Sequence, residues 1–133
     1  MTDLEFKIDL LKVQLNVLEL DDRLPSFKAR LYLNIAHPTG EFNYLAEDIW
    51  FECANWSDFT SKISSINKDD DAVVLTSMSE QFILKLALND ISILIKEVSF
   101  HDFIIELKHF SGLTEGDFYV IKKAICGFDR WWE

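Results

Sequence analysis

Apolar and polar residues alternate with a period of two along several parts of this chain. The clearest run covers residues 27–35, where one parity is entirely apolar: Phe27, Ala29, Leu31, Leu33 and Ile35. The other parity includes Lys28, Arg30 and Asn34. Successive side chains of a strand point to opposite faces. The pattern therefore predicts an antiparallel strand with one face in the core and the other in solvent.

A similar alternation precedes this strand, but its parity changes once. Apolar residues first occupy even positions and then odd positions: Phe6, Ile8 and Leu10, followed by Val13, Leu15 and Val17. Either a strand with a bulge near residues 10–11 or two short strands would account for the change.

Turn-forming residues occur at 21–26 and 37–40, and residues 41–45 are expected to begin a return strand. Later strands are expected at residues 73–78, 82–88, 91–95 and 103–109. Asn89-Asp90 would form a two-residue turn between two of them, although the usual glycine is absent. Short turns between consecutive strands predict antiparallel pairing.

Two segments have helical spacing instead. The first carries Trp56, Phe59, Ile63 and Ile66 and is expected to begin at Asn55, whose side chain could cap it. Residues 47–53 before it suit either a strand end or a helix start.

The second helical segment lies at the end of the chain. Its apolar residues are spaced three, four, three and four apart: Phe118, Ile121, Ile125, Phe128 and Trp132. Thr114 is the expected cap, with Asp117 at the box position. This stripe predicts an amphipathic helix that closes a core.

The order of these elements is strands, a helix, strands and a helix, which predicts an α+β fold. The expected architecture is one mainly antiparallel curved sheet with two amphipathic helices packed on one face. A length of 133 residues with 49% hydrophobic residues predicts a single domain, 1–133, with one dense core.

Composition narrows the classes of partner. Lysine and arginine number 13 against 23 acidic residues, which gives a formal net charge of −10. Phosphate backbones and anionic membrane surfaces repel such a chain, so neither nucleic acid nor a membrane is an expected partner. Acidity serves solubility in many proteins, and it also favours association with a basic protein.

Cellular location is indicated by three features. Cys53 and Cys126 lie far apart among apolar residues and are expected to be free thiols in a reducing compartment. Residues 1–6 are acidic and do not resemble a signal peptide, and no apolar run is long enough to span a membrane. The expected location is the cytoplasm.

Candidate catalytic chemistry is sparse. His101, Asp102 and His109 could include an oriented base, but adjacent strand residues point to opposite faces. Lys68 precedes three aspartates that could bind a hard cation, but the spacing of a calcium loop is absent. No nucleophile elbow or cysteine pair with metal-ligand spacing is present, so we expect no catalytic residue, no metal and no cofactor.

Binding chemistry has better candidates. Clustered carboxylates and one tryptophan are the residues expected to contact a protein partner: Asp21, Asp22, Asp69, Asp70, Asp71 and Trp131. Within a continued helix, Trp131 would lie about 100° from Trp132 and could be exposed, as binding hot spots often are. The alternative is that both rings fold back onto the sheet.

The ordered pattern resembles the WapI-like immunity-type proteins of bacteria. The residues that carry the resemblance are the strand at 27–35, Glu47-Asp48, the helix at 56–66, the strand at 103–110 and the last helix at 117–125. This resemblance implies binding rather than catalysis, with neutralisation of a cognate toxin as the expected role. It transfers no site residue.

These observations predict a non-enzymatic protein-binding domain, an immunity protein that covers a basic toxin domain. The alternative is an acidic secretion-type chaperone that holds an unfolded client segment. An enzyme whose site is assembled only in three dimensions is the third hypothesis.

Overall fold

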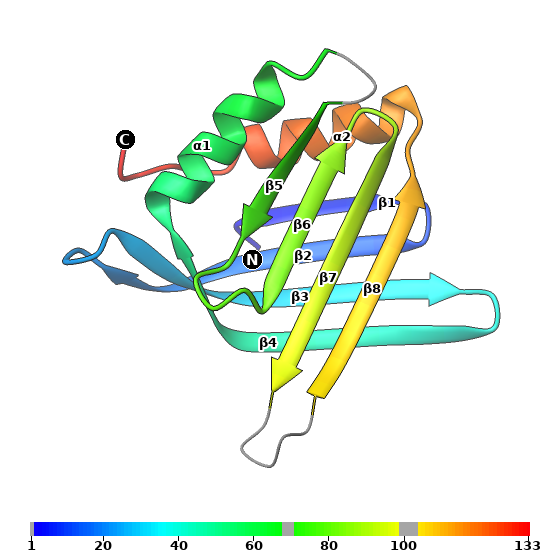
Figure 1. Ribbon diagram of the computed structural model, residues 1–133, viewed down its shortest axis with the longest axis horizontal. Coiled ribbons are helices and arrows are strands. Elements are labelled where there is room, and N and C mark those ends of the chain that lie inside the picture. The colour runs from blue at the N-terminus through cyan, green and yellow to red at the C-terminus, as the bar shows by residue number, and fades with distance from the viewer. Residues whose placement is uncertain (1, 68–70, 99–103) are drawn as a thin grey trace.

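The computed structural model describes residues 2–67, 71–98 and 104–133 (Figure 1). These residues form eight strands and two helices. In chain order they are β1 (Leu4–Ile8), β2 (Leu11–Asp21), β3 (Ser26–His37), β4 (Gly40–Glu52), α1 (Cys53–Ser64), β5 (Ala72–Thr76), β6 (Phe82–Ala87), β7 (Asp90–Val98), β8 (Ile104–Gly112) and α2 (Glu115–Cys126). Every strand pair is antiparallel, so the expected α+β class is confirmed.

The strands divide into two four-stranded sheets where one sheet was expected. Their orders are β1-β2-β3-β4 and β5-β6-β7-β8. Strands pair only with their neighbours in sequence, and α1 separates the two groups along the chain. Figure 1 shows the second sheet in front of the first, with its strands crossing at a steep angle.

The parity change near the N-terminus marks two strands, which was one of the two expected alternatives. A tight turn at residues 9–10 joins β1 to β2, and Asp9 adopts a positive φ of 44° there. Aspartate tolerates this left-handed conformation better than most residues. Leu11 therefore begins a new strand whose odd positions face the core.

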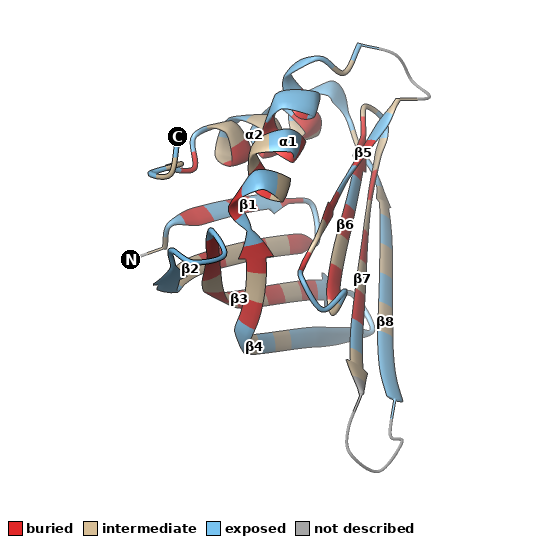
Figure 2. Cartoon of the chain, turned by 60° about the vertical axis from the view of Figure 1, so that its left-hand side comes forward, coloured by how far each residue is buried: buried red, intermediate tan, exposed pale blue. Residues whose placement is uncertain are grey.

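The core lies between the two sheets and is closed at one end by the helices. α2 packs against β1, α1 packs against β5, and the helices contact each other. In Figure 2 both helices lie over the same end of the space between the sheets. Buried side chains from all four layers form one continuous cluster, so the protein has one hydrophobic core.

α1 begins earlier than expected. The ambiguous residues 47–52 complete β4, and Cys53 is the first helical residue. The N-cap is Glu52 and makes no side-chain capping bond, so the prediction of Asn55 as the cap is wrong. Asn55 instead lies inside the first turn, where its buried Oδ1 has no partner among the described residues.

The strands of the second sheet match the predicted ones with small shifts. The turn between β6 and β7 lies at Leu88-Asn89, one residue before the expected pair. β8 extends to Gly112, and Phe103 lies outside the described residues.

α2 has the predicted N-terminus and a different C-terminus. The Asp117 N–H donates to Thr114 Oγ1 at 3.1 Å, and the Thr114 N–H donates to Asp117 Oδ2 at 3.0 Å, so the capping box is confirmed. The helix ends at Cys126 with Gly127 as its C-cap. Phe128 and Trp132 therefore lie beyond the helix and do not continue its stripe.

Changing Thr114 to Ala should lower the free energy of unfolding by about 1 kcal/mol, because the Asp117 N–H loses its acceptor. Chemical denaturation measures this loss. The Thr114→Ser variant keeps the oxygen and should remain close to the parent. Equal losses in both variants would show that the methyl group, not the capping bond, stabilises this end.

The cysteines are free thiols, as expected. Cys53 is buried and Cys126 is half-buried. Burial raises the pKa of the Cys53 thiol, which keeps it protonated and poorly reactive.

Candidate protein-binding groove

A groove of about 420 Å³ lies between β2 and the segment that follows α2. We call it the C-terminal groove, and the residues that line it are Asp3, Val17, Leu18, Glu19, Leu20, Phe128, Asp129 and Trp131. Its walls are apolar with carboxylates at their margins. This combination suits a protein contact with an apolar centre and a charged rim.

A β-bulge shapes the first wall. Val17 pairs with Ala29 and Glu19 pairs with Lys28, so Leu18 is an extra residue in β2. A bulge increases local twist and redirects the side chains that follow it. Leu18 and Leu20 are consequently exposed, although the earlier apolar residues of β2 face the core.

The second wall is built on an aromatic cluster around Phe27 of β3, which is completely buried. Five ring centroids lie 5.6–5.8 Å from that of Phe27, and they belong to Phe51, Trp56, Phe128, Trp131 and Trp132. Both tryptophans of the C-terminal pair therefore fold back onto the first sheet. Trp131 still exposes 41% of its surface, on the groove side.

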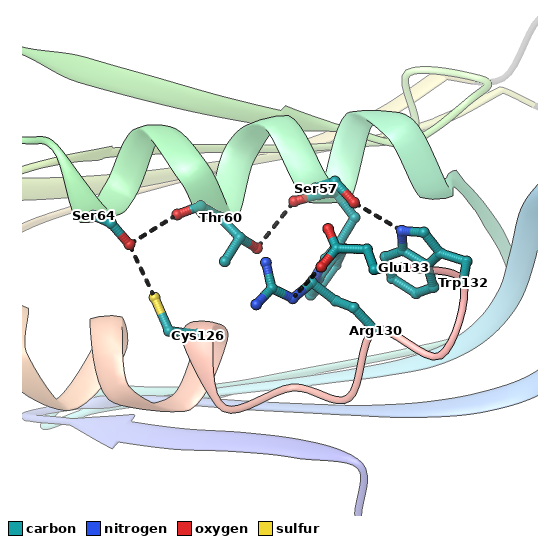
Figure 3. Close-up of polar contacts among 8 residues, drawn as sticks. Ser57, Thr60, Ser64, Cys126, Arg130, Trp132 and Glu133 are labelled. Carbon is teal, nitrogen blue, oxygen red and sulfur yellow. Dashed lines mark hydrogen bonds and ion pairs between the residues drawn. The ribbon is translucent and has the colours of Figure 1, made fainter.

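The C-terminal segment is fixed to α1 by polar contacts (Figure 3). Trp132 Nε1 donates a hydrogen bond of 2.7 Å to Ser57 Oγ. Further along the same helix, Ser64 Oγ lies 3.8 Å from Cys126 Sγ at the end of α2. Because Trp132 is held in this way, its neighbour Trp131 is ordered before any partner binds, which lowers the entropy lost on binding.

The groove is acidic. Asp3, Glu19 and Asp129 line it, and none of its described lining residues is Lys or Arg. Asp3 Oδ2 accepts a 2.6 Å bond from the Val17 N–H, and Glu19 pairs with Lys28 at 2.9 Å on the outer side of the sheet. The hydrogen bond with Glu19 raises the pKa of Lys28, so that pair stays charged at neutral pH.

The structure brings some of the predicted binding residues together. Asp21 and Asp22 follow Leu20 directly, are exposed at the β2–β3 turn, and extend the groove wall that faces Trp131. Asp71 lies just before β5 at another part of the molecule (Figure 1). Asp69 and Asp70 lie outside the described residues.

The histidine candidates gain no catalytic arrangement. His101 and Asp102 lie outside the described residues. His109 is half-buried on β8, and desolvation lowers its pKa, so the ring is neutral at pH 7. Within the described ranges no three His, Cys, Asp or Glu side chains are grouped as metal ligands.

Sequence reasoning missed Leu18, Leu20, Asp3 and Asp129 as parts of the groove. A signal for the first two was present, because apolar residues switch from odd to even positions after Val17. Such a switch indicates a bulge. Asp3 and Asp129 carry no local signal, since only the tertiary fold brings the two ends of the chain to the same groove.

Comparison with known proteins found no matching family model, curated protein or solved structure. The resemblance to WapI-like proteins therefore stays a prediction. None of the described helices is long and apolar enough to cross a membrane.

Proposed function

We propose that this protein is a non-enzymatic binding domain of the immunity type, which neutralises a basic toxin domain by covering part of its surface. The observation that carries the proposal is Trp131, an exposed indole held against a buried aromatic cluster beside acidic side chains. Tryptophans in such settings are enriched among the residues that dominate binding energy.

The charge distribution supports a basic partner. The formal net charge is −10, and the C-terminal groove adds a local concentration of carboxylates around an apolar centre. Long-range attraction would speed encounter, and burial of Trp131, Leu18 and Leu20 would slow dissociation.

Binding to the product of the neighbouring gene tests this function. Changing Trp131 to Ala should weaken binding by about 2 kcal/mol or more, roughly a 30-fold rise in Kd. Tyr119→Ala is the matched control, because Tyr119 is an exposed aromatic on α2 that does not line the groove. Titration calorimetry measures both affinities.

The electrostatic part has a separate readout. Changing Asp21 and Asp22 to Asn should mainly lower the association rate, and high salt should have the same effect on the parent. Salt-independent association would remove the electrostatic argument. Tight capture of an unfolded segment, with no binding to a folded toxin domain, would move the assignment to the chaperone alternative.

A further inference from the structure

The space between the two sheets is open at the end away from the helices (Figure 2). A second cavity of about 310 Å³ lies there between the edge strands β4 and β8. We call it the intersheet mouth, and the residues that line it are Leu33, Ile35, Phe42, Asn43, Tyr44, Ile95, Glu97, Ile105, Glu106 and Leu107. It is separate from the C-terminal groove, with which it shares no residue.

Two large apolar side chains in the mouth are uncovered although they project from the inner faces of their strands. Phe42 pairs with the buried Ile35, and Ile105 follows the same parity as Leu107, which pairs with the buried Ile95. Phe42 is nevertheless 58% exposed and Ile105 is 54% exposed. In Figure 1 the β3–β4 hairpin runs on past β8, so the second sheet ends before it covers the first.

β8 has an open edge along this uncovered region. It pairs with β7 through nine consecutive residue pairs without a register shift, and no described strand lies on its other side. A long, regular edge that carries apolar residues is a template for pairing with another strand. The edge of β4 is less suitable, because the register shift opposite Arg30 leaves Glu47 and Asp48 as a bulge in that strand.

The polar groups of the mouth are acidic. Tyr44 Oη donates a 2.6 Å hydrogen bond to Glu97 Oε1 across the gap between the sheets. Burial and Glu97 together raise the pKa of Tyr44, so the hydroxyl stays protonated beside an ionised carboxylate. Glu97 and Glu106 are the only charged residues that line the mouth within the described chain.

We propose that a basic protein partner adds an extended segment beside β8 as a further strand, with alternate apolar side chains inserted into the mouth between Phe42 and Ile105. One occupant would then satisfy both the free edge of β8 and the uncovered apolar surface of the β3–β4 hairpin. The carboxylates of the mouth and the net charge of −10 select a segment whose remaining side chains are Lys or Arg. The inference rests on the proposed protein-binding function and adds a second contact to it.

A synthetic peptide with alternating valine and lysine, as long as the nine residues of β8, is the probe. We expect it to bind the whole chain at least about tenfold more tightly than a peptide with alternating valine and glutamate, and less tightly as salt rises. Backbone amides of β8 should become protected from hydrogen exchange at alternate positions. Equal affinity for the two peptides, or binding without protection of β8, would overturn the proposal.

Matched variants locate the site. Phe42→Ser should weaken peptide binding at least about tenfold. Leu45→Ser should leave it within about twofold, because Leu45 is 57% exposed on the opposite face of the same strand. Ile105→Ser and Ile104→Ser form a second pair on β8, with Ile105 facing the mouth. Unchanged melting temperatures show that all four variants fold, and equal losses within either pair would contradict the assigned site.

Two further outcomes separate this inference from the proposed function. Trp131→Ala should leave peptide binding unchanged, because Trp131 does not line the mouth. If the neighbour-encoded protein binds through Trp131 while the peptide does not bind, only the strand-addition proposal fails. If sedimentation shows that the chain alone dimerises through β8, a second copy occupies the edge and the proposal of a separate partner is overturned.

Discussion

Changing Phe27 to Ala should lower the free energy of unfolding by about 3–5 kcal/mol, the largest effect expected of any single substitution here. Phe27 is fully buried, and its ring is the shared neighbour of five other aromatic rings from β4, α1 and the C-terminal segment. Truncation would open a cavity that rigid neighbouring rings cannot fill. Equilibrium denaturation by urea measures the loss.

The exposed Phe110 provides the control for this prediction. It lies on the outer face of β8 and is 70% exposed, so Phe110→Ala should change stability by no more than about 0.5 kcal/mol. Phe27→Leu should retain part of the lost stability, and it remains measurable if the alanine variant does not fold. A Phe27→Ala protein as stable as the parent would contradict the central position of this ring.

Changing Ile125 to Ala should lower the free energy of unfolding by about 2–5 kcal/mol. Ile125 lies where α2 meets both sheets, since it borders a small void of about 20 Å³ together with Leu31 of the first sheet and Leu84 of the second. A void of this size leaves little room for collapse, so most of the deleted volume would remain as a cavity.

Val120 on the same helix is the matched control, because it is 42% exposed and faces away from the core. Val120→Ala should change stability by no more than about 0.5 kcal/mol. Thermal and urea denaturation of both variants compare the two faces of α2. An Ile125→Ala protein that unfolds like the parent would remove α2 from the core that joins the sheets.

Local patterns predicted most strands and the start of the last helix. The alternation of residues 27–35 corresponds to β3, and the capping box at Thr114 begins α2 as expected. These features depend on side chains within a few residues of one another. The end of α2 was harder to predict, since Phe128 and Trp132 continue the spacing of the helix and yet are positioned by contacts with Phe27.

The division into two sheets could not be read from the sequence. Alternation shows that a strand has an inner face, but it does not show which other strand lies opposite. The inner-face residues Phe42 and Ile105 illustrate the difference, because their pattern matches that of buried residues and the short second sheet leaves them exposed.

The candidate binding residues were predictable in part. Trp131 stood out because tandem tryptophans are unusual, and Asp21 and Asp22 because their charges are clustered. Their proximity along one groove depends on the bulge at Leu18 and on the course of the chain after Gly127. Asp71 lies elsewhere, so the carboxylates considered from the sequence do not form a single site.

Hydrogen exchange of the chain, alone and saturated with the neighbour-encoded protein, tests the central claim of protein binding through the C-terminal groove. We expect slower exchange in the complex at residues 17–25 and 127–133, which form and flank the groove. Trp131→Ala should abolish that protection at the same protein concentrations. Protection confined to elements outside the groove, with affinity unchanged by Trp131→Ala, would contradict the claim.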